Sequence, residues 1–318
     1  MPMKKVKSLH TFTMDAAFAH EDEGTAFSSP SSVKDVMSRA KTTFPGVITA
    51  RQLGRSLDVI LSNAGIGKES TLLATSFCCD EVNRDLEDEL RATYGQNFNL
   101  GGIGGFPFGG VTAFGALGHH VPENGTCLIV YGPHVGIDFD GVVGKVNRRG
   151  RCGSGACCNT ALASMAYVKA VRAGEQIHLP DLSDPIDAQQ TFVDSALLDH
   201  GERLETADNP HVELPHAMFD CQEALFKRLI AKGARNYPEN ISVVMLGGII
   251  VNTPEGTPEY FLPKKFELCN NRFEVLSDLL GPLIDEGNKD IRTIIKERQY
   301  KEKMEKAKEG QIEITIKP

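Results

Sequence analysis

The chain has 318 residues, 41% of them hydrophobic, so it is long enough to bury a substantial core as one large domain or two smaller ones. Its net charge of −8 argues against a nucleic acid or an anionic membrane as partner. No stretch approaches the roughly 18 to 20 apolar residues that a membrane span needs, and residues 1–7 lack the apolar core of a secretory signal. We therefore expect a soluble, intracellular protein of the cytoplasm or a plastid.

The N-terminal region differs in composition from the rest of the chain. Residues 1–30 are polar and rich in Ser, Asp and Glu, which predicts a partly disordered arm. Helical patterns follow at 33–43 and 48–63, and Gly65 and Gly67 predict the end of the second helix. No later linker divides the chain, so we expect one domain over residues 31–318.

From residue 70 onward, predicted strands and helices alternate. The order is a strand at 70–77, a helix at 80–94, a glycine-rich loop at 100–115, a strand at 126–132, a hairpin at 141–147 and a helix at 156–173. The remaining elements are a helix at 217–232, strands at 241–251 and 260–268, two helices within 272–308 and a final edge strand at 312–317. This alternation predicts an α/β fold with a central, mainly parallel β-sheet flanked by helices.

Cysteine and histidine side chains follow the ends of two predicted strands and open a predicted helix. Cys78 follows the first strand, His134 follows the second, and Cys157 and Cys158 begin the next helix. Because ligands gather at the carboxyl ends of parallel strands, we expect these side chains to meet. Zinc prefers thiolate and imidazole ligands, and a catalytic site keeps three of them with water in the fourth position. The sequence therefore predicts a zinc site, with Cys157 and Cys158 as alternatives for the third ligand.

An acidic and a basic residue accompany this set. Asp80 and Arg84 are four positions apart in the predicted helix at 80–94, so we expect them to lie on one face and form an ion pair. A carboxylate held in this way stays ionised and can orient a metal-bound water. The alternative is an N-cap beside a surface ion pair. The basic cluster at 148–151 is interpreted as a solvated turn.

Other side chains offer alternatives for the site. His119 and His120 could also bind a metal, but they end a predicted helix, so His134 is preferred. The glycines of the loop at 100–115 allow the backbone to approach closely, and its aromatic side chains could line a pocket for a small apolar substrate. These side chains are Phe106, Phe108 and Phe114. The alternative is a glycine-lined packing loop with core phenylalanines.

Taken together, these motifs resemble the β-class carbonic anhydrases, and in particular the limiting-CO2-inducible protein B/C (LCIB) family. The segments that carry the resemblance are SFCCDEVNR at 76–84, GFPFGGVTAFG at 105–115, HHVP at 119–122, YGPHVGI at 131–137 and GGIIVNTPEG at 247–256. Two spacings depart from the ordinary β-class pattern. The arginine follows the aspartate by four positions rather than two, and Cys158 follows His134 by 24 rather than three.

The resemblance implies a zinc ion held by Cys78, His134 and Cys158, with Asp80 and Arg84 as a gatekeeping pair. It also implies the reversible hydration of CO2 to bicarbonate by zinc-bound hydroxide, in a homodimer or a higher homo-oligomer that takes part in inorganic-carbon handling. His119 or His120 is a hypothetical proton shuttle, because imidazole titrates near neutral pH.

Two further functions compete with this interpretation. Some members of the family keep the fold without activity, so the chain could be a silent protein that binds inorganic carbon or serves as an assembly partner. A thiol-dependent hydrolase that uses Cys78 or Cys158 with His134 is disfavoured, because it leaves one thiol and the arginine without a role.

Overall fold

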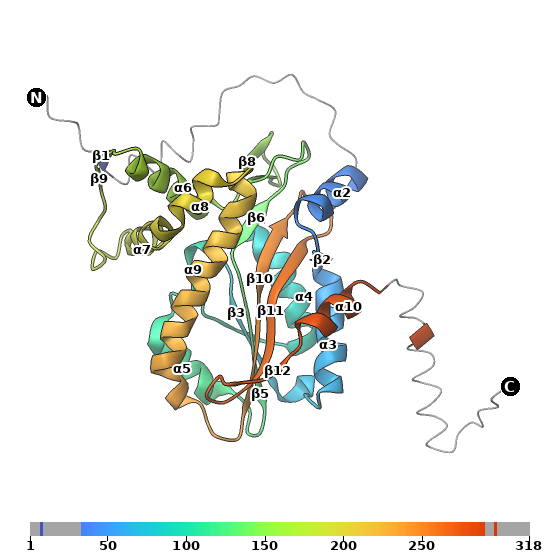
Figure 1. The fold of residues 1–318 in the computed structure, drawn as a ribbon. Coiled ribbons are helices and arrows are strands. Elements are labelled where there is room, and N and C mark those ends of the chain that lie inside the picture. Colours follow the sequence, from blue (N-terminus) through green and yellow to red (C-terminus); the bar gives the residue numbers. More distant parts are fainter. Residues whose placement is uncertain (1–6, 9–32, 290–295, 298–318) are drawn as a thin grey trace, which may run out of the picture.

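A mixed β-sheet runs through the centre of the protein in the computed structural model, which describes residues 7–8, 33–289 and 296–297 (Figure 1). The strands lie in the order β12 (Val275–Asp278), β11 (Tyr260–Asn270), β10 (Ser242–Asn252), β5 (Thr126–Tyr131), β3 (Thr71–Ser76) and β4 (Asn97–Asn99). Two short strands extend the sheet: β2 (Ile48–Thr49) pairs with β11, and β6 (His134–Gly136) pairs with β10.

The centre of the sheet is parallel. Strands β4, β3, β5 and β10 run in one direction, and β6 is also parallel to β10. At the other edge, β11 is antiparallel to β10, and both β12 and β2 are antiparallel to β11. The predicted fold class is therefore confirmed. Because β3 and β5 pair in register up to Ser76 and Tyr131, the carboxyl ends of both strands lie side by side.

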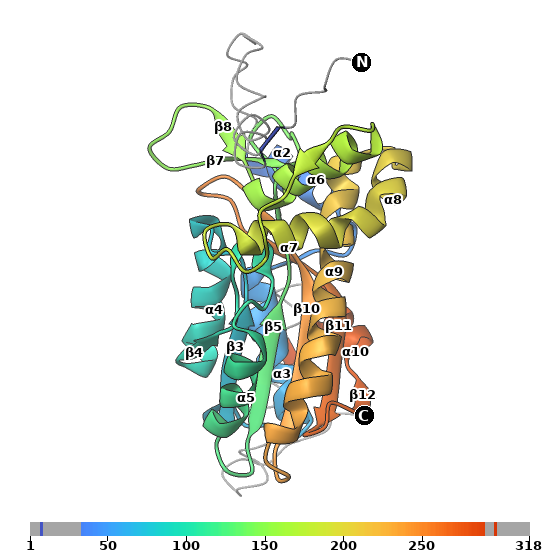
Figure 2. The ribbon, with the colours of Figure 1, turned by 90° about the vertical axis from the view of Figure 1, so that its left-hand side faces the viewer.

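Helices cover both faces of this sheet (Figure 1 and Figure 2). On one face lie α2 (Val33–Thr43), α5 (Gly110–His120) and α9 (Pro210–Gly233), and on the other lie α3 (Ala50–Asn63), α4 (Arg84–Tyr94) and α10 (Leu280–Gly287). Side chains along β5 alternate between the two cores: Ile129 packs in the first, and Leu128 and Val130 pack in the second. Since both faces are buried, the strand is a continuous apolar run in the sequence.

A helical layer lies beyond the carboxyl ends of the parallel strands (Figure 2). It contains α6 (Asn159–Arg172), α7 (Ala188–Leu197), α8 (Gly201–Thr206) and part of α9, joined by a third apolar core that includes Cys78 and Cys158. Two small sheets lie at this end, one of β7 (Lys145–Asn147) with β8 (Ser154–Ala156), the other of β1 (Lys7–Ser8) with β9 (Ile177–His178). The ends of β3 and β5 are thereby enclosed by protein.

A buried carboxyl group connects α6 to α7. Asp194 is fully buried, and its Oδ1 accepts hydrogen bonds from Ser164 Oγ at 2.6 Å and Gln190 Nε2 at 2.7 Å. Within the described residues its Oδ2 has no partner. Burial raises the pKa of Asp194 from 3.8 to about 6, although both hydrogen bonds act to lower it.

The raised pKa predicts a loss of stability as the pH increases. The folded protein keeps this proton to a higher pH than the unfolded chain, so ionisation of Asp194 lowers the free energy of unfolding as the pH rises. This loss is absent below about pH 4 and complete above about pH 7, where it reaches about 3 kcal/mol. Urea unfolding should show that Asp194→Asn removes this part of the decline, because the amide cannot ionise. Parallel pH curves for the two proteins would contradict the assignment.

Most predicted elements are present, with differences at their ends. The second helix begins at Ala50 rather than at residue 48, because Ile48 and Thr49 pair with β11 and Thr49 caps the helix. The helices predicted within 272–308 are wrong at their start, because the chain forms strand β12 there and α10 begins only at Leu280. A tight turn leads into β12, in which Asn270 Oδ1 accepts hydrogen bonds from the backbone N–H groups of Arg272 and Glu274. The parts of the predicted helices at 290–295 and beyond residue 297, the edge strand predicted at 312–317 and most of the arm at 1–30 lie outside the described residues.

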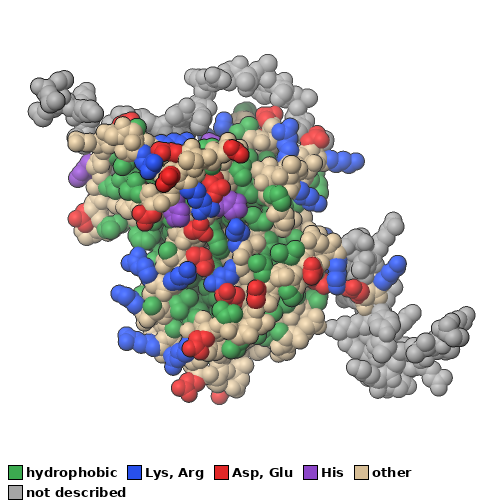
Figure 3. Space-filling view, in the orientation of Figure 1, with side chains coloured by type: hydrophobic (Ala, Val, Ile, Leu, Met, Phe, Trp, Pro, Cys, Tyr) green, Lys and Arg blue, Asp and Glu red, His purple; other side chains and the backbone are tan. Residues whose placement is uncertain are grey.

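The surface carries charges of both signs. Lysine, arginine, aspartate and glutamate side chains are interspersed over the face that Figure 3 shows. At the edge of the sheet, Val275 and Leu276 of β12 are 53% and 64% exposed. Among the helices that the structure describes, none combines the length and apolar character required to cross a membrane.

Candidate metal centre

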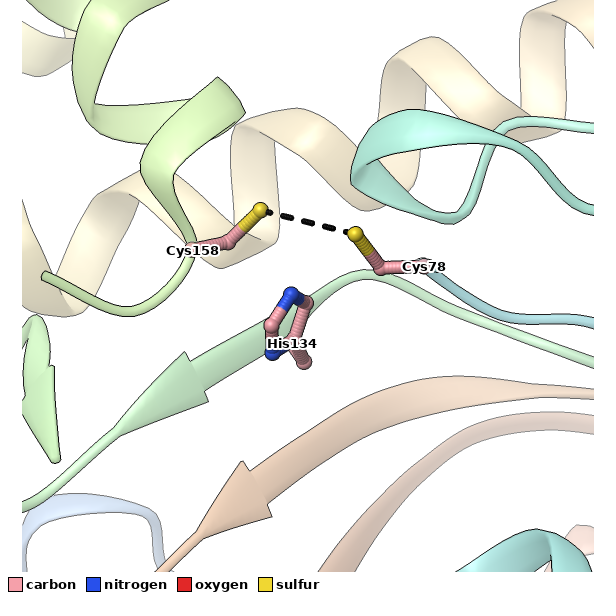
Figure 4. Close-up of side chains that lie close together, drawn as sticks. All are labelled: Cys78, His134 and Cys158. Atoms are coloured by element: carbon pink, nitrogen blue, oxygen red, sulfur yellow. Dashed lines mark hydrogen bonds between the residues drawn. The ribbon is translucent and has the colours of Figure 1, made fainter. Parts of the chain in front are cut away.

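Three side chains that lie far apart in the sequence converge at the carboxyl ends of the parallel strands (Figure 4). Cys78 comes two residues after β3, His134 begins β6, and Cys158 is the N-cap residue of α6. Their Sγ and imidazole nitrogen atoms lie within 4.8 Å of one another, and the two sulfur atoms are 3.9 Å apart. All three side chains are buried. The expected meeting of these side chains is therefore observed.

The imidazole ring of His134 offers a nitrogen to this cluster. Its Nδ1 lies 2.8 Å from Asn252 Oδ1, whereas its buried Nε2 has no hydrogen-bond partner among the described residues. Figure 4 shows one ring nitrogen directed toward the two sulfur atoms. Because a buried polar atom without a partner is costly, an unsatisfied nitrogen beside two thiols is the pattern expected of a metal ligand. The donor set fits zinc.

The thiol of Cys78 disfavours ionisation in the absence of a cation. The hydrogen bond with Cys158 and then burial raise the pKa of Cys78 far above its usual value, while His134 acts to lower it. The backbone N–H of Gly104 donates to Cys78 Sγ at 3.2 Å and supports a negative charge there. A divalent cation would remove the protons of both thiols, so metal binding at this position is coupled to proton release.

The carboxylate of Asp80 is bound by an arginine other than the predicted one. Arg148 forms two hydrogen bonds with it, from Nη1 to Oδ1 at 2.8 Å and from Nη2 to Oδ2 at 2.9 Å. Burial acts to raise the pKa of Asp80, but the hydrogen bonds from Arg148, together with the charge of His134 when its ring is protonated, outweigh burial and lower the pKa to about 2. The carboxylate is therefore ionised at neutral pH.

The expected ion pair between Asp80 and Arg84 is not formed. Arg84 instead contacts the carboxylate of Glu87 and donates from Nη2 to the Cys78 carbonyl oxygen at 3.0 Å. The reason is local: residues 81–83 form a 3-10 turn that Asp80 caps, and α4 begins only at Arg84. The two residues do not share one α-helix, so the four-residue spacing does not align them.

The interpretation of residues 148–151 as a solvated turn is wrong for Arg148. This residue follows β7, so it belongs to the hairpin that lies between His134 and Cys158 in the sequence, and its Nη2 also donates to the Ala156 carbonyl oxygen at 3.1 Å. Its side chain is only 16% exposed. The sequence feature that could have pointed to this hairpin is the 24-residue spacing between His134 and Cys158. Because these two residues meet, the chain between them must leave the site and return to it.

A second cluster overlaps the first. It contains Asp80, His134 and Cys157, whose possible ligand atoms also lie within 4.8 Å of one another. Cys157 Sγ is 3.5 Å from His134 Nδ1 and 3.5 Å from Asn252 Oδ1, so it lies on the side of the ring that faces Asn252. Cys158 instead lies beside Cys78. Both adjacent cysteines thus contact the site from different sides.

The structure divides the three phenylalanines of the glycine-rich loop between two cores. Phe106 and Phe108 are stacked with ring centroids 5.6 Å apart, and both adjoin the apolar core that contains Cys78 and Cys158. Phe114 does not: it lies on α5 against Tyr237 and Phe273 in a different core. The expected position of Phe114 at the site is therefore wrong, because residue 114 belongs to a helix on the face of the sheet rather than to the loop.

The glycine-rich loop packs tightly against the sheet. A Cβ atom at Gly105, whose φ is +81°, would lie 2.4 Å from the Gly132 carbonyl oxygen just before His134. A side chain at this position would push the loop away from the end of β5. The loop therefore serves packing, as the alternative interpretation proposed, while its Phe106 and Phe108 lie close to the cysteines.

His119 and His120 are distant from the cluster. They end α5, and the chain then enters β5 at Thr126, whereas His134 follows the other end of that strand. Six residues of strand span about 20 Å. The structure thus brings neither of these histidines to the cysteines.

The fold and the buried thiol and imidazole donors define an α/β protein of the carbonic-anhydrase type. Residues 47–270 match the family described as limiting CO2-inducible proteins B/C beta carbonic anhydrases, so the chain belongs to this family. No curated protein matches the sequence at a significant level.

Solved structures agree with this assignment. The crystal structure of PtLCIB4, a homologue of the limiting CO2-inducible protein LCIB, is 37% identical, with 76% of this chain and 99% of PtLCIB4 covered and a TM-score of 0.71. A point mutant of PtLCIB4 is 35% identical over 77% of this chain and 98% of its own, with a TM-score of 0.72. LCIB itself is 21% identical over 74% of this chain and 96% of its own, with a TM-score of 0.58, and shares the fold.

Proposed function

We propose that this protein is a zinc-dependent carbonic anhydrase that catalyses the reversible hydration of CO2 to bicarbonate. The observation that carries this proposal is the buried set of Cys78, His134 and Cys158, in which His134 Nε2 has no partner among the described residues. Two sulfur atoms and one imidazole nitrogen are the ligands of known catalytic zinc sites that keep a fourth position open.

The surrounding residues suit this reaction. When bound, zinc lowers the pKa of a coordinated water toward about 7 and so supplies a nucleophile at neutral pH. Asp80 stays ionised and can accept a hydrogen bond that orients this nucleophile, and Arg148 holds the carboxylate in place. Phe106 and Phe108 provide apolar surface next to the cysteines for CO2, which is small and non-polar. Arg84 acts by holding the Cys78 carbonyl oxygen rather than Asp80.

We further propose that the protein acts inside the cell in inorganic-carbon handling, as a homodimer. The exposed β12 edge supports association, because an uncovered edge strand with apolar side chains readily pairs with another chain. A second copy that covers Val275 and Leu276 would remove this edge from solvent.

Metal analysis combined with a CO2-hydration assay tests the proposed activity. The purified wild type should contain about one zinc per chain and hydrate CO2 between about pH 7 and pH 9, and a chelator should abolish the activity reversibly. Cys78→Ser should lose both zinc and activity. Zinc without hydration activity over this pH range would favour the silent protein that binds inorganic carbon or serves as an assembly partner.

A further inference from the structure

We propose that Asn252, held by Glu259, is a positioning residue that fixes the ring of His134 with Nε2 directed at the two cysteines. This inference rests on the proposed metal site and assigns a role to residues outside the ligand set. Asn252 is the last residue of β10, and Glu259 ends the loop that connects β10 to β11. Both side chains are buried, with 2% and 8% exposure.

The orientation of the Asn252 amide is determined by its neighbours. Its Nδ2 lies 3.0 Å from the Val82 carbonyl oxygen, 2.5 Å from Glu259 Oε1 and 3.3 Å from Asn83 Oδ1. A backbone carbonyl oxygen can only accept a hydrogen bond, so the NH2 group must face Val82. The amide oxygen must then face His134 Nδ1, from which it is 2.8 Å away.

This orientation determines which nitrogen of His134 carries the proton. Because Asn252 Oδ1 is an acceptor, His134 Nδ1 must donate to it, and the neutral ring then has its lone pair on Nε2. A metal ligand needs that lone pair, and it is the nitrogen that has no partner among the described residues. Asn252 therefore selects the tautomer and the ring orientation that the metal requires.

The Val82 carbonyl oxygen prevents the amide from turning over. If the Asn252 amide were reversed, its oxygen would face this backbone oxygen, and neither atom could donate a hydrogen bond. Glu259 Oε1, 2.5 Å from Nδ2, accepts a second hydrogen bond from the same NH2 group. The same contacts join the end of β10 to the turn at 81–83 that follows Cys78. Asn252 thus couples the segment that carries Cys78 and Asp80 to the strand that carries His134.

Zinc affinity is the property that distinguishes this role from general packing. Residues that orient a ligating histidine typically contribute about 10–100-fold to metal affinity. Asn252→Leu keeps a similar volume but removes the acceptor, so we expect zinc to bind about 10–100-fold more weakly in competition with a chelator. Asn252→Asp keeps an oxygen opposite Nδ1 but places its second oxygen against the Val82 carbonyl oxygen, so its affinity should lie between those of Asn252→Leu and the wild type.

Gln190→Leu is the matched control. It also replaces a buried amide by leucine, but the partners of Gln190 are Ser164, Asp194 and the Thr160 carbonyl oxygen, none of which belongs to the metal site. Its zinc affinity should stay within a few-fold of the wild type. Equal affinities for Asn252→Leu and the wild type would overturn the positioning role while leaving the proposed zinc site intact. A wild type that binds no zinc would overturn both.

Nitrogen-15 NMR of the zinc-loaded wild type tests the same inference without a variant. The ring of His134 should carry an exchange-protected proton on Nδ1 and a metal-shifted resonance at Nε2. A proton on Nε2, or a metal shift at Nδ1, would overturn the role of Asn252 even if the leucine variant failed to fold.

Discussion

Cys158→Ser is expected to reduce zinc affinity by more than about 100-fold and to abolish CO2 hydration, whereas Cys157→Ser should keep most of both. Cys158 Sγ lies 3.9 Å from Cys78 Sγ, on the side of the cluster where His134 Nε2 has no partner among the described residues. Cys157 Sγ instead contacts His134 Nδ1 and Asn252 Oδ1. Removing a direct zinc ligand should weaken zinc binding more than removing a group that only contacts a ligand, so zinc affinity should fall further in Cys158→Ser than in Cys157→Ser.

The two cysteine variants are natural controls for each other. Both replace a buried thiol with a hydroxyl in adjacent positions, so general destabilisation should be similar. In Cys157→Ser the hydroxyl can still donate to Asn252 Oδ1, so zinc affinity should fall by no more than about 10-fold. Zinc content should be measured by competition with a chelator, and turnover by the rate of CO2 hydration. If Cys157→Ser loses zinc and Cys158→Ser retains it, the ligand assignment is wrong.

Arg148→Ala is expected to lower kcat/KM for CO2 hydration by about 10–100-fold while zinc content stays near the wild-type level. Arg148 supplies two hydrogen bonds to Asp80, and no other arginine within the described residues contacts that carboxylate. Without it, Asp80 would lose its fixed orientation and burial would raise its pKa. The ligands themselves are untouched, so turnover should suffer rather than metal binding.

Arg149→Ala is the matched control for this prediction. Arg149 is the next residue of the same hairpin, but its side chain is 88% exposed and its Nε lies 4.0 Å from Oε1 of the exposed Glu255. Its replacement should leave kcat/KM within about two-fold of the wild type, as is usual for an exposed ion pair. A large loss in Arg84→Ala with no loss in Arg148→Ala would contradict the assignment and restore the pairing that the sequence suggested.

The convergence of two proposed metal ligands was predictable because it follows from sheet geometry. Two apolar runs in a strand, helix, strand order indicate parallel neighbours, and parallel strands end at one edge. Cys78 and His134 therefore meet although 55 residues separate them, as the register of β3 with β5 and of β6 with β10 shows. A cysteine at the start of α6 was predictable for a related reason, because the start of a helix favours a thiolate. This reasoning left Cys157 and Cys158 as alternatives, and only the family resemblance favoured Cys158.

The residues that surround these proposed ligands were harder to predict from the sequence. Whether Asp80 and Arg84 share a helix depends on where α4 begins, and a 3-10 turn of three residues changed the answer. The actual partner, Arg148, lies 68 positions away on a hairpin whose path no local pattern determines. Asn252 belonged to a motif that was noted only for family resemblance, and its role depends on four hydrogen-bonding neighbours from three separate segments.

X-ray absorption at the zinc edge of the purified wild type distinguishes the two overlapping ligand sets. We expect two sulfur ligands at about 2.3 Å and one imidazole nitrogen at about 2.0–2.1 Å, with one further light atom completing a tetrahedron. This is the set that Cys78, His134 and Cys158 would provide. A single sulfur with nitrogen and oxygen ligands, as Asp80, His134 and Cys157 would give, would contradict it.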